Sequence, residues 1–194
     1  MSETRPYTQV KRAQAAERTR TALLDAAEHV FLAGDWEEAS LEAIAARAGT
    51  TKQTLLRHFG SKAGLLEAGA QRGLEQVGAQ RLGAPRDDID GAIGNLLDHY
   101  EDRGDEGLKL AAIGGDGALA EIADRARRLH YDWVDHAFGA WIGRAQQPAR
   151  TRAAVIAICD VHTWHLLKRD LGLGRAEVHH TLTLMIRRLL EEDA

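Results

Sequence analysis

The feature that most constrains this chain is a pair of short helical patterns that meet at a glycine, Gly49. Ser40 can cap a first helix, because the apolar residues within Leu41–Ala48 recur at helical spacing. After the glycine, Thr50 and Thr51 offer their hydroxyls to the free amides of a second helix that runs from Lys52 to Phe59. The pattern predicts a helix-turn-helix, a unit that places its second helix in the major groove of DNA.

One side of the second helix has the chemistry of a DNA-contacting surface. Leu55 and Phe59 are four residues apart and can pack inward together. The residues expected at or near the outer surface are Thr50, Thr51, Lys52, Gln53, Leu56, Arg57, His58 and Lys62. Except for the leucine, they carry hydroxyl, amide, imidazole or cationic groups, which suit phosphates and base edges.

Individual roles follow from the side-chain chemistry. Gln53 can pair with adenine through two hydrogen bonds, and Lys52 or Arg57 can pair with guanine. The residues that we assign to phosphates are Thr51, His58 and Lys62. Lys62 lies in the first turn of the next helix, where a cation opposes the helix dipole unless a negative group is close.

The span from Arg20 to Leu66 resembles the DNA-binding domain of TetR-type transcriptional regulators. The matching residues are Leu24, Ala26, Ala27, Phe31, Gly34, Ser40, Ile44, Ala45, Ala48, Gly49, Thr54, Leu55, His58, Phe59, Ser61, Lys62 and Leu66. The chain departs from the family at Gln53, where a glycine is usual, and at Leu56, where the family has a phosphate-contacting tyrosine. The resemblance implies a DNA-binding head and a helical body that dimerises through its last two helices and binds an apolar inducer.

The distribution of charge agrees with a DNA-binding head more than the total does. The net charge is -4, but residues 1–62 hold nine Lys or Arg against eight Asp or Glu. Affinity for a polyanion depends on the local patch. Arg5, Lys11 and Arg12 precede the expected first helix and form a basic arm that can enter a minor groove; a tail without contacts is the alternative.

Helical periodicity continues to the end of the chain, and no alternating strand pattern interrupts it. The expected helices outside the motif are Gln14–Ala33, Ser61–Leu82, Asp87–Tyr100, Glu106–Ile113, Ala118–Ile142, Pro148–Leu171 and Ala176–Glu191. We therefore predict an all-α fold, with a three-helix DNA-binding domain over residues 1–62. A larger ligand-binding and dimerisation domain would occupy residues 63–194.

The last two expected helices carry more apolar residues than one buried face needs. Their apolar positions are Ala153, Ala154, Ile156, Ala157, Ile158, Val161, Trp164, Leu166, Leu167, Val178, Leu182, Met185, Ile186, Leu189 and Leu190. The surplus favours an antiparallel hairpin that pairs with its twin in a four-helix bundle. The alternative is that both faces are buried within one subunit.

Aromatic and imidazole groups cluster in the middle of the chain. The residues expected to line a small-molecule site are Tyr100, His130, Trp133, Phe138 and Trp164. Such a mixture is typical of ligand pockets, although aromatic residues on a helical stripe are more often core packing. The resemblance to ligand-controlled regulators favours the pocket, and it does not identify the ligand.

Other chemistries have weaker support in the sequence. His162 and His165 are one turn apart, but the spacing lacks a third metal ligand, so we expect no metal and no cofactor. Cys159 has no basic neighbour to activate it, and we expect a packed thiol in a reducing cytoplasm. No apolar run approaches a membrane span, the first twenty residues lack the apolar core of a secretory signal, and no catalytic motif stands out.

These observations predict a cytoplasmic, non-enzymatic transcriptional regulator. We expect a repressor that binds a palindromic operator as a homodimer and is released by a small molecule. The alternative is an all-helical small-molecule-binding or enzyme module in which the helix-turn-helix pattern serves packing alone.

Overall fold

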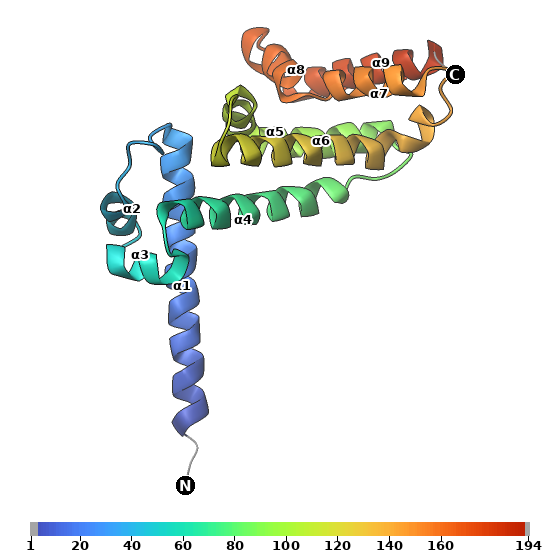
Figure 1. Cartoon of the computed structure of the whole chain (residues 1–194). Coiled ribbons are helices and arrows are strands. Elements are labelled where there is room, and N and C mark those ends of the chain that lie inside the picture. The colour runs from blue at the N-terminus through green and yellow to red at the C-terminus, as the bar shows by residue number, and fades with distance from the viewer. Residues whose placement is uncertain (1–3, 193–194) are drawn as a thin grey trace. The chain divides into compact units, whose positions relative to one another are not determined.

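Helices make up all the regular secondary structure in the part of the chain that the structure describes (Figure 1). This computed structural model describes the backbone of residues 4–192 and the side chains of residues 9–191. It confirms the predicted all-α fold. The chain forms two compact units, Met1–Arg72 and Gly73–Ala194. No helix between Thr4 and Glu192 combines the length and the apolar content needed to cross a bilayer.

The first unit contains α1 (Thr4–Ala33), α2 (Leu41–Arg47), α3 (Lys52–Phe59) and the start of α4 (Lys62–Leu82). Its core is formed by apolar side chains from all four helices. The buried residues are Leu23, Leu24, Ala26, Ala27, Trp36, Ile44, Ala45, Leu55 and Leu65. This core fixes the orientation of α3 against α1 and α2.

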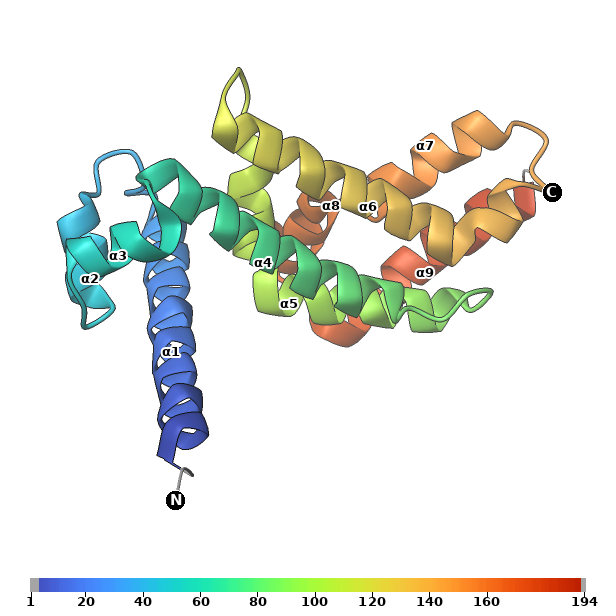
Figure 2. The same cartoon turned by 60° about the horizontal axis from the view of Figure 1, so that its bottom comes forward.

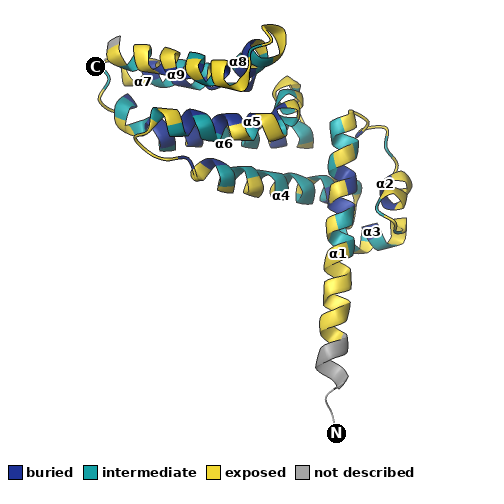
Figure 3. Ribbon diagram, turned by 180° about the vertical axis from the view of Figure 1, so that it is seen from behind, coloured by how far each residue is buried: buried dark blue, intermediate teal, exposed yellow. Residues whose placement is uncertain are grey.

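The first helix is longer than predicted, which changes the interpretation of the basic arm. α1 begins at Thr4 instead of Gln14, so Lys11 and Arg12 lie within a helix. Pro6 is compatible with this start, because amides in the first helical turn have no partner within the helix. Figure 3 shows the exposed surface of α1 before its packed second half, and residues 9–18 are all exposed. The side chain of Arg5 lies outside the described residues.

The boundary between the units falls within α4, ten residues beyond the expected boundary at 62/63. Arg72 explains the difference, because its guanidinium donates to Asp25 at 2.7 Å and to Glu28 at 2.9 Å, both on α1. These pairs attach the first half of α4 to the head.

The second unit is built from the rest of α4, α5 (Ile89–Ala112), α6 (Ala118–Ile142), α7 (Pro148–Ile158), α8 (Val161–His165), a π-helical turn at Leu166–Asp170 and α9 (Arg175–Glu192). α5 packs against α6, α8 and α9, and α7 packs against both α6 and α9. Figure 1 shows α7 and α9 side by side, and Figure 2 shows the same helices from another direction. The bounds of α6 are those predicted from the sequence.

Two expected helix boundaries in this unit are wrong. α5 is continuous, whereas we predicted a break at Asp102–Gly104 and a separate helix over Glu106–Ile113. Gly104 allows close packing here, since a Cβ atom on it would lie 2.4 Å from the ring of Trp164. The glycine therefore marks a contact between helices, and the helix continues through it.

The expected helix Pro148–Leu171 is also interrupted. It ends at Ile158, and Asp160 caps the next helix by accepting a hydrogen bond from the amide of His162 at 2.8 Å. Asp160 is in the extended conformation that suits an N-cap residue. The chain then passes from α8 into the π-helical turn before it reaches α9.

Candidate nucleic-acid interface

The helix-turn-helix is held by the capping residues that its sequence predicts. The Ser40 hydroxyl accepts from the Ala43 amide at 3.1 Å, and the Thr51 hydroxyl accepts from the Thr54 amide at 3.2 Å. The turn between the helices needs a left-handed residue, and Gly49 supplies it with φ +68°. Because Leu55 is fully buried, the opposite face of α3 points to solvent.

The solvent side of α3 carries much of the predicted DNA-contact set. Thr51, Lys52, Gln53 and Arg57 are exposed. The remaining members are half-buried, and they are Thr50, Leu56, His58 and Lys62. The exposed group spans the first two turns of α3, which is the end of a recognition helix that usually meets base edges.

Gln53 and Arg57 are the most available donors in this group. Both are exposed, and neither makes a side-chain hydrogen bond or ion pair to another described residue. They are four residues apart and therefore lie on the same face of α3. An amide and a guanidinium so placed can reach neighbouring bases or phosphates without breaking an internal contact.

Lys52, in contrast, has a partner within the head. Its ammonium donates to the Glu42 carboxylate of α2 at 2.7 Å, and this hydrogen bond lowers the pKa of Glu42 below its usual value. Both side chains are exposed, so the pair is screened by solvent and adds little stability. A DNA contact by Lys52 has to compete with this carboxylate.

Lys62 also has internal partners, which the sequence interpretation did not foresee. Its ammonium donates to the Glu37 carbonyl oxygen at 3.0 Å and lies 5.3 Å from the centre of the Trp36 ring. Trp36 is itself buried at 6% exposure. Lys62 therefore ties the start of α4 to the segment between α1 and α2, and its assignment to phosphate remains a prediction.

His58 occupies a more covered position than its assignment to phosphate suggests. Its side chain is half-buried, and its Nε2 atom is buried without a hydrogen-bond partner among the described residues. The ring lies 6.0 Å from that of Phe59. A phosphate contact by His58 would satisfy this nitrogen only if neighbouring side chains moved.

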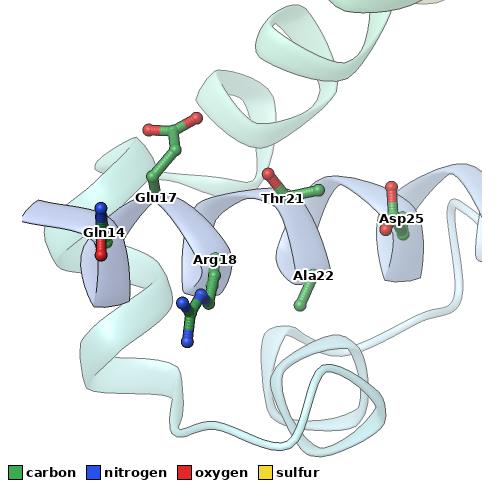
Figure 4. A pocket seen from close by; sticks show the side chains of 6 residues that line it. All are labelled: Gln14, Glu17, Arg18, Thr21, Ala22 and Asp25. Carbon is green, nitrogen blue, oxygen red and sulfur yellow. The ribbon is translucent and has the colours of Figure 1, made fainter.

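A shallow open depression runs along α1 (Figure 4). It is lined by Gln14, Glu17, Arg18, Thr21, Ala22 and Asp25. All six residues come from one helix, and the polar members include both charge signs. The depression thus has the character of an amphiphilic helix surface, without converging walls that would enclose a small molecule.

In the second unit, the five residues predicted to line a ligand site form two groups of ring contacts, which Arg81 joins and which we call the aromatic cluster. Tyr100 and Trp164 have ring centres 5.6 Å apart, and those of Trp133 and Phe138 are 5.7 Å apart. His130 stacks on Trp133 at 6.0 Å. All except the half-buried His130 belong to the hydrophobic core, so in this structure the cluster is packed core.

Burial controls the protonation of several groups around this cluster. It lowers the pKa of His130 to about 4 and that of the neighbouring His99 to about 3, with Arg81 acting in the same direction on both. It raises the pKa of the Cys159 thiol to about 12. The histidines are therefore neutral near pH 7, and the thiol is unreactive.

His162 and His165, the two histidines one turn apart, belong to α8 and contact acidic side chains near them. His162 contacts Asp160 at 2.7 Å, and His165 lies 3.7 Å from Asp170. Within residues 9–191, no three His, Cys, Asp or Glu side chains are grouped so that they could hold a metal ion. The histidines are instead used in local contacts near the ends of α8.

The sequence interpretation missed Arg81, the residue of α4 that contacts the aromatic cluster. Its side chain is 3% exposed, and its guanidinium carbon lies about equally close to the ring centres of Trp133 and Tyr100, at 5.0 and 5.2 Å. An arginine in the last turn of an expected helix gives no sequence signal of burial, because that position also suits an exposed cation.

Comparison with known proteins supports the interpretation of the head. The family model for bacterial regulatory proteins of the tetR family matches residues 23–68, which extend from α1 into α4. A comparison with curated proteins gave no match. The fold is similar to the crystal structure of a transcriptional regulator from Rhodococcus sp. Rha1, with a TM-score of 0.64 and 19% sequence identity over 91% of this chain and 96% of that chain.

The matched span includes the capping residues, the turn glycine and the whole of α3. The predicted helix-turn-helix is therefore present both in the structure and in a family whose members regulate transcription. The N-terminal unit therefore carries a helix-turn-helix domain of the tetR family of bacterial regulatory proteins, and this domain supports a DNA-binding transcriptional regulator.

Proposed function

We propose that the chain is a cytoplasmic homodimeric repressor that binds a palindromic operator and leaves it when a small molecule binds the second unit. The observation that carries the proposal is the exposed polar start of α3 within a capped helix-turn-helix. In this proposal, Gln53 and Arg57 read bases, and the more enclosed Lys62 and His58 contribute to phosphate binding.

The palindrome follows from a two-fold dimer. Two copies related by two-fold symmetry present the same α3 surface in opposite orientations, which matches inverted half-sites. The half-sites would be about one helical turn of DNA, roughly 34–36 Å, apart or a multiple of it. Footprinting of the chain on its own upstream DNA tests this arrangement, and an asymmetric single half-site would contradict it.

Support for the dimer comes from α9. Its buried face includes Leu182 and Ile186, yet Leu184 and Met185 are 47% and 40% exposed. α9 packs along α7, on which Ala153 and Ala157 are exposed. A pair of helices with apolar residues on the uncovered side suits a four-helix bundle between two copies.

Sedimentation of the full chain tests the dimer. Leu184→Glu with Met185→Glu should convert dimers to monomers, because four carboxylates would be buried across the two-fold axis. Leu82→Glu is the matched control, since Leu82 is 56% exposed but lies on α4. A double variant that sediments as a dimer would reject the proposed surface.

Gel-shift titration tests the function as a whole. The parent chain should bind its upstream DNA in preference to random DNA, and the monomeric double variant should lose most of that affinity. Reporter expression separates repression from activation, because loss of the chain raises expression from a repressed promoter. A fall in expression would mean that the chain activates transcription.

A further inference from the structure

We propose that the second unit binds a ligand with an anionic group, of the aryl carboxylate class, and that the Arg81 guanidinium pairs with that group. The inference rests on the proposed function, because it identifies the chemistry of the ligand that would control the same regulator. It begins with a charge in the core that this chain does not neutralise.

Arg81 is buried to a degree that is unusual for a cation. Its side chain is 3% exposed, and it is the only charged residue in the buried class among residues 9–191. Removing a guanidinium from water costs several kcal/mol unless an anion or well-placed acceptors replace the water. A buried arginine therefore needs a counter-ion, internal or external, or acceptors and ring faces that take the place of water.

The contacts of Arg81 are with neutral groups. Its Nη1 atom lies 3.4 Å from Nδ1 of His130, and its guanidinium faces the rings of Tyr100 and Trp133. The Tyr100 hydroxyl donates to the Cys159 carbonyl oxygen at 2.8 Å. No carboxylate of the side chains that the structure describes forms an ion pair with Arg81.

The nearest acidic residue does not form an ion pair with Arg81, and the neighbouring imidazoles add no second positive charge near pH 7. Asp160 acts electrostatically on Tyr100 and His130, but its Oδ1 atom is already held by the amide and the ring of His162, at 2.8 and 2.7 Å. His99 and His130 have pKa values of about 3 and about 4, so they are neutral near pH 7. Arg81 is therefore the cation of this cluster, and no described carboxylate is hydrogen-bonded to it.

Trp133 provides a second observation at the same place. Its side chain is fully buried, and its Nε1 atom has no hydrogen-bond partner among the residues that the structure describes. The ring that carries this donor lies beside the guanidinium, 5.0 Å from the guanidinium carbon. The same small region thus holds two kinds of donor, one of them charged, and no described carboxylate is bonded to either. A carboxylate oxygen is an acceptor suited to both.

The surrounding residues indicate what the rest of the ligand is like. Tyr100, Trp133 and Trp164 form the aromatic side of the cluster, and Phe138 packs against Trp133. Such rings favour a flat apolar group attached to the anion. A guanidinium can bind a carboxylate through two parallel hydrogen bonds. This geometry favours a carboxylate over a ligand group that has only one acceptor atom. Since Arg81 and Trp133 are covered, side chains must move as the ligand enters.

The experiment compares acids with their neutral amides on the full-length chain. Benzoate and phenylacetate are titrated against benzamide and phenylacetamide, with tryptophan fluorescence as the binding signal and thermal denaturation as a second measurement. We expect the acids to bind more tightly than the amides by at least about 30-fold, the loss typical of removing one partner from a buried charge pair.

Variants connect that preference to the residue. Arg81→Gln should abolish the difference between acid and amide, whereas Arg128→Gln, at an exposed position of α6, should keep it. Trp133→Phe keeps a ring but removes the donor, so it should weaken acid binding while amide binding changes less. If Arg81→Gln does not fold, the acid-to-amide ratio of the parent and the Trp133→Phe result still decide the matter.

The proposal is overturned if the parent binds neither acid, if acid and amide bind equally, or if Arg81→Gln keeps the preference. Operator release is measured separately by gel shift. Acids that bind without releasing DNA would uphold the anion site and reject ligand control of repression. If a neutral compound releases DNA while neither acid binds, the anion site is rejected and ligand control of DNA binding is upheld.

Discussion

Gly104 offers a direct test of the way in which α5 packs in the body. It lies within α5, and an alanine Cβ at this position would be 2.4 Å from Cζ3 and 2.6 Å from Cη2 of Trp164. Trp164 is 2% exposed and lies against Tyr100, so its ring cannot move away without disturbing the core. We therefore expect Gly104→Ala to destabilise the protein although alanine favours helices.

The magnitude follows from two opposing effects. Replacing glycine by alanine in a helix interior stabilises it by about 0.5–1 kcal/mol, whereas overpacking a core costs about 1–3 kcal/mol. The clash involves two atoms of a rigid ring, which places the cost in the upper half of that range. We expect Gly104→Ala to lower the free energy of unfolding by about 1–2 kcal/mol.

Gly94 is the matched control, because it lies in the same helix and a Cβ there meets no atom within 4 Å. Gly94→Ala should raise the free energy of unfolding by about 0.5–1 kcal/mol. Urea denaturation at one fixed protomer concentration measures both variants, since an oligomer's stability depends on concentration. Equal stability of the two variants would refute the close packing of Gly104 on Trp164.

Three further predictions concern the head and the buried histidines. Gln53→Ala should weaken binding to the operator by about 1–3 kcal/mol and change the affinity for random DNA little. Gel-shift titrations that show equal losses of affinity for operator and random DNA would exclude a base-reading role for Gln53. Lys62→Ala should lower the free energy of unfolding by about 1 kcal/mol, because it removes the contacts to Glu37 and Trp36, and unchanged urea denaturation would contradict this. Because burial lowers the folded-state pKa values of His99 and His130 to about 3 and about 4, the unfolded chain binds more protons below about pH 6.5, and their stabilising contribution is lost as pH falls through that range. The free energy of unfolding of the parent should therefore fall by up to about 5 kcal/mol between neutral pH and about pH 4.5, as measured by urea denaturation. The fall should be smaller in the double variant His99→Gln with His130→Gln.

Sequence reasoning worked where the structure is determined locally. Ser40 and Thr51 cap their helices as predicted, because each acts on backbone groups within a few residues of itself. The periodicity that buries Leu55 also exposes Gln53 and places it outside the core. Capping and amphipathic spacing are short-range, so one sequence is enough to identify them.

Prediction from the sequence failed where a residue's role depends on a partner far along the chain. Gly104 has the character of a helix breaker until Trp164, sixty positions later, is placed against it. The hydrogen-bond partner of Lys62 is the backbone carbonyl oxygen of Glu37. Every residue has such an oxygen, so the sequence gives no sign of this contact. Arg81 is similar, because its burial depends on the packing of α5 and α6 around α4.

α4 is the element through which a ligand in the body could affect DNA binding. It is one helix, with Arg72 paired to α1 in the first unit and Arg81 buried in the second. These residues are nine positions apart, about 14 Å along a helix axis. A ligand that moves Arg81 therefore acts on a helix that also carries an anchor of the head.

Two glycines in this helix allow a test of that coupling. A Cβ at Gly69 meets no atom within 4 Å, and one at Gly73 meets only the Glu106 carboxylate, at 3.9 Å, so neither glycine is needed for close packing. Each lowers helix stability by about 0.5–1 kcal/mol relative to alanine, which makes the helix easier to bend between its anchors. We expect Gly69→Ala with Gly73→Ala to retain operator affinity while requiring more ligand for release in a gel shift. Release of the double variant at the parent's ligand concentration would show that bending at these glycines has no part in the coupling.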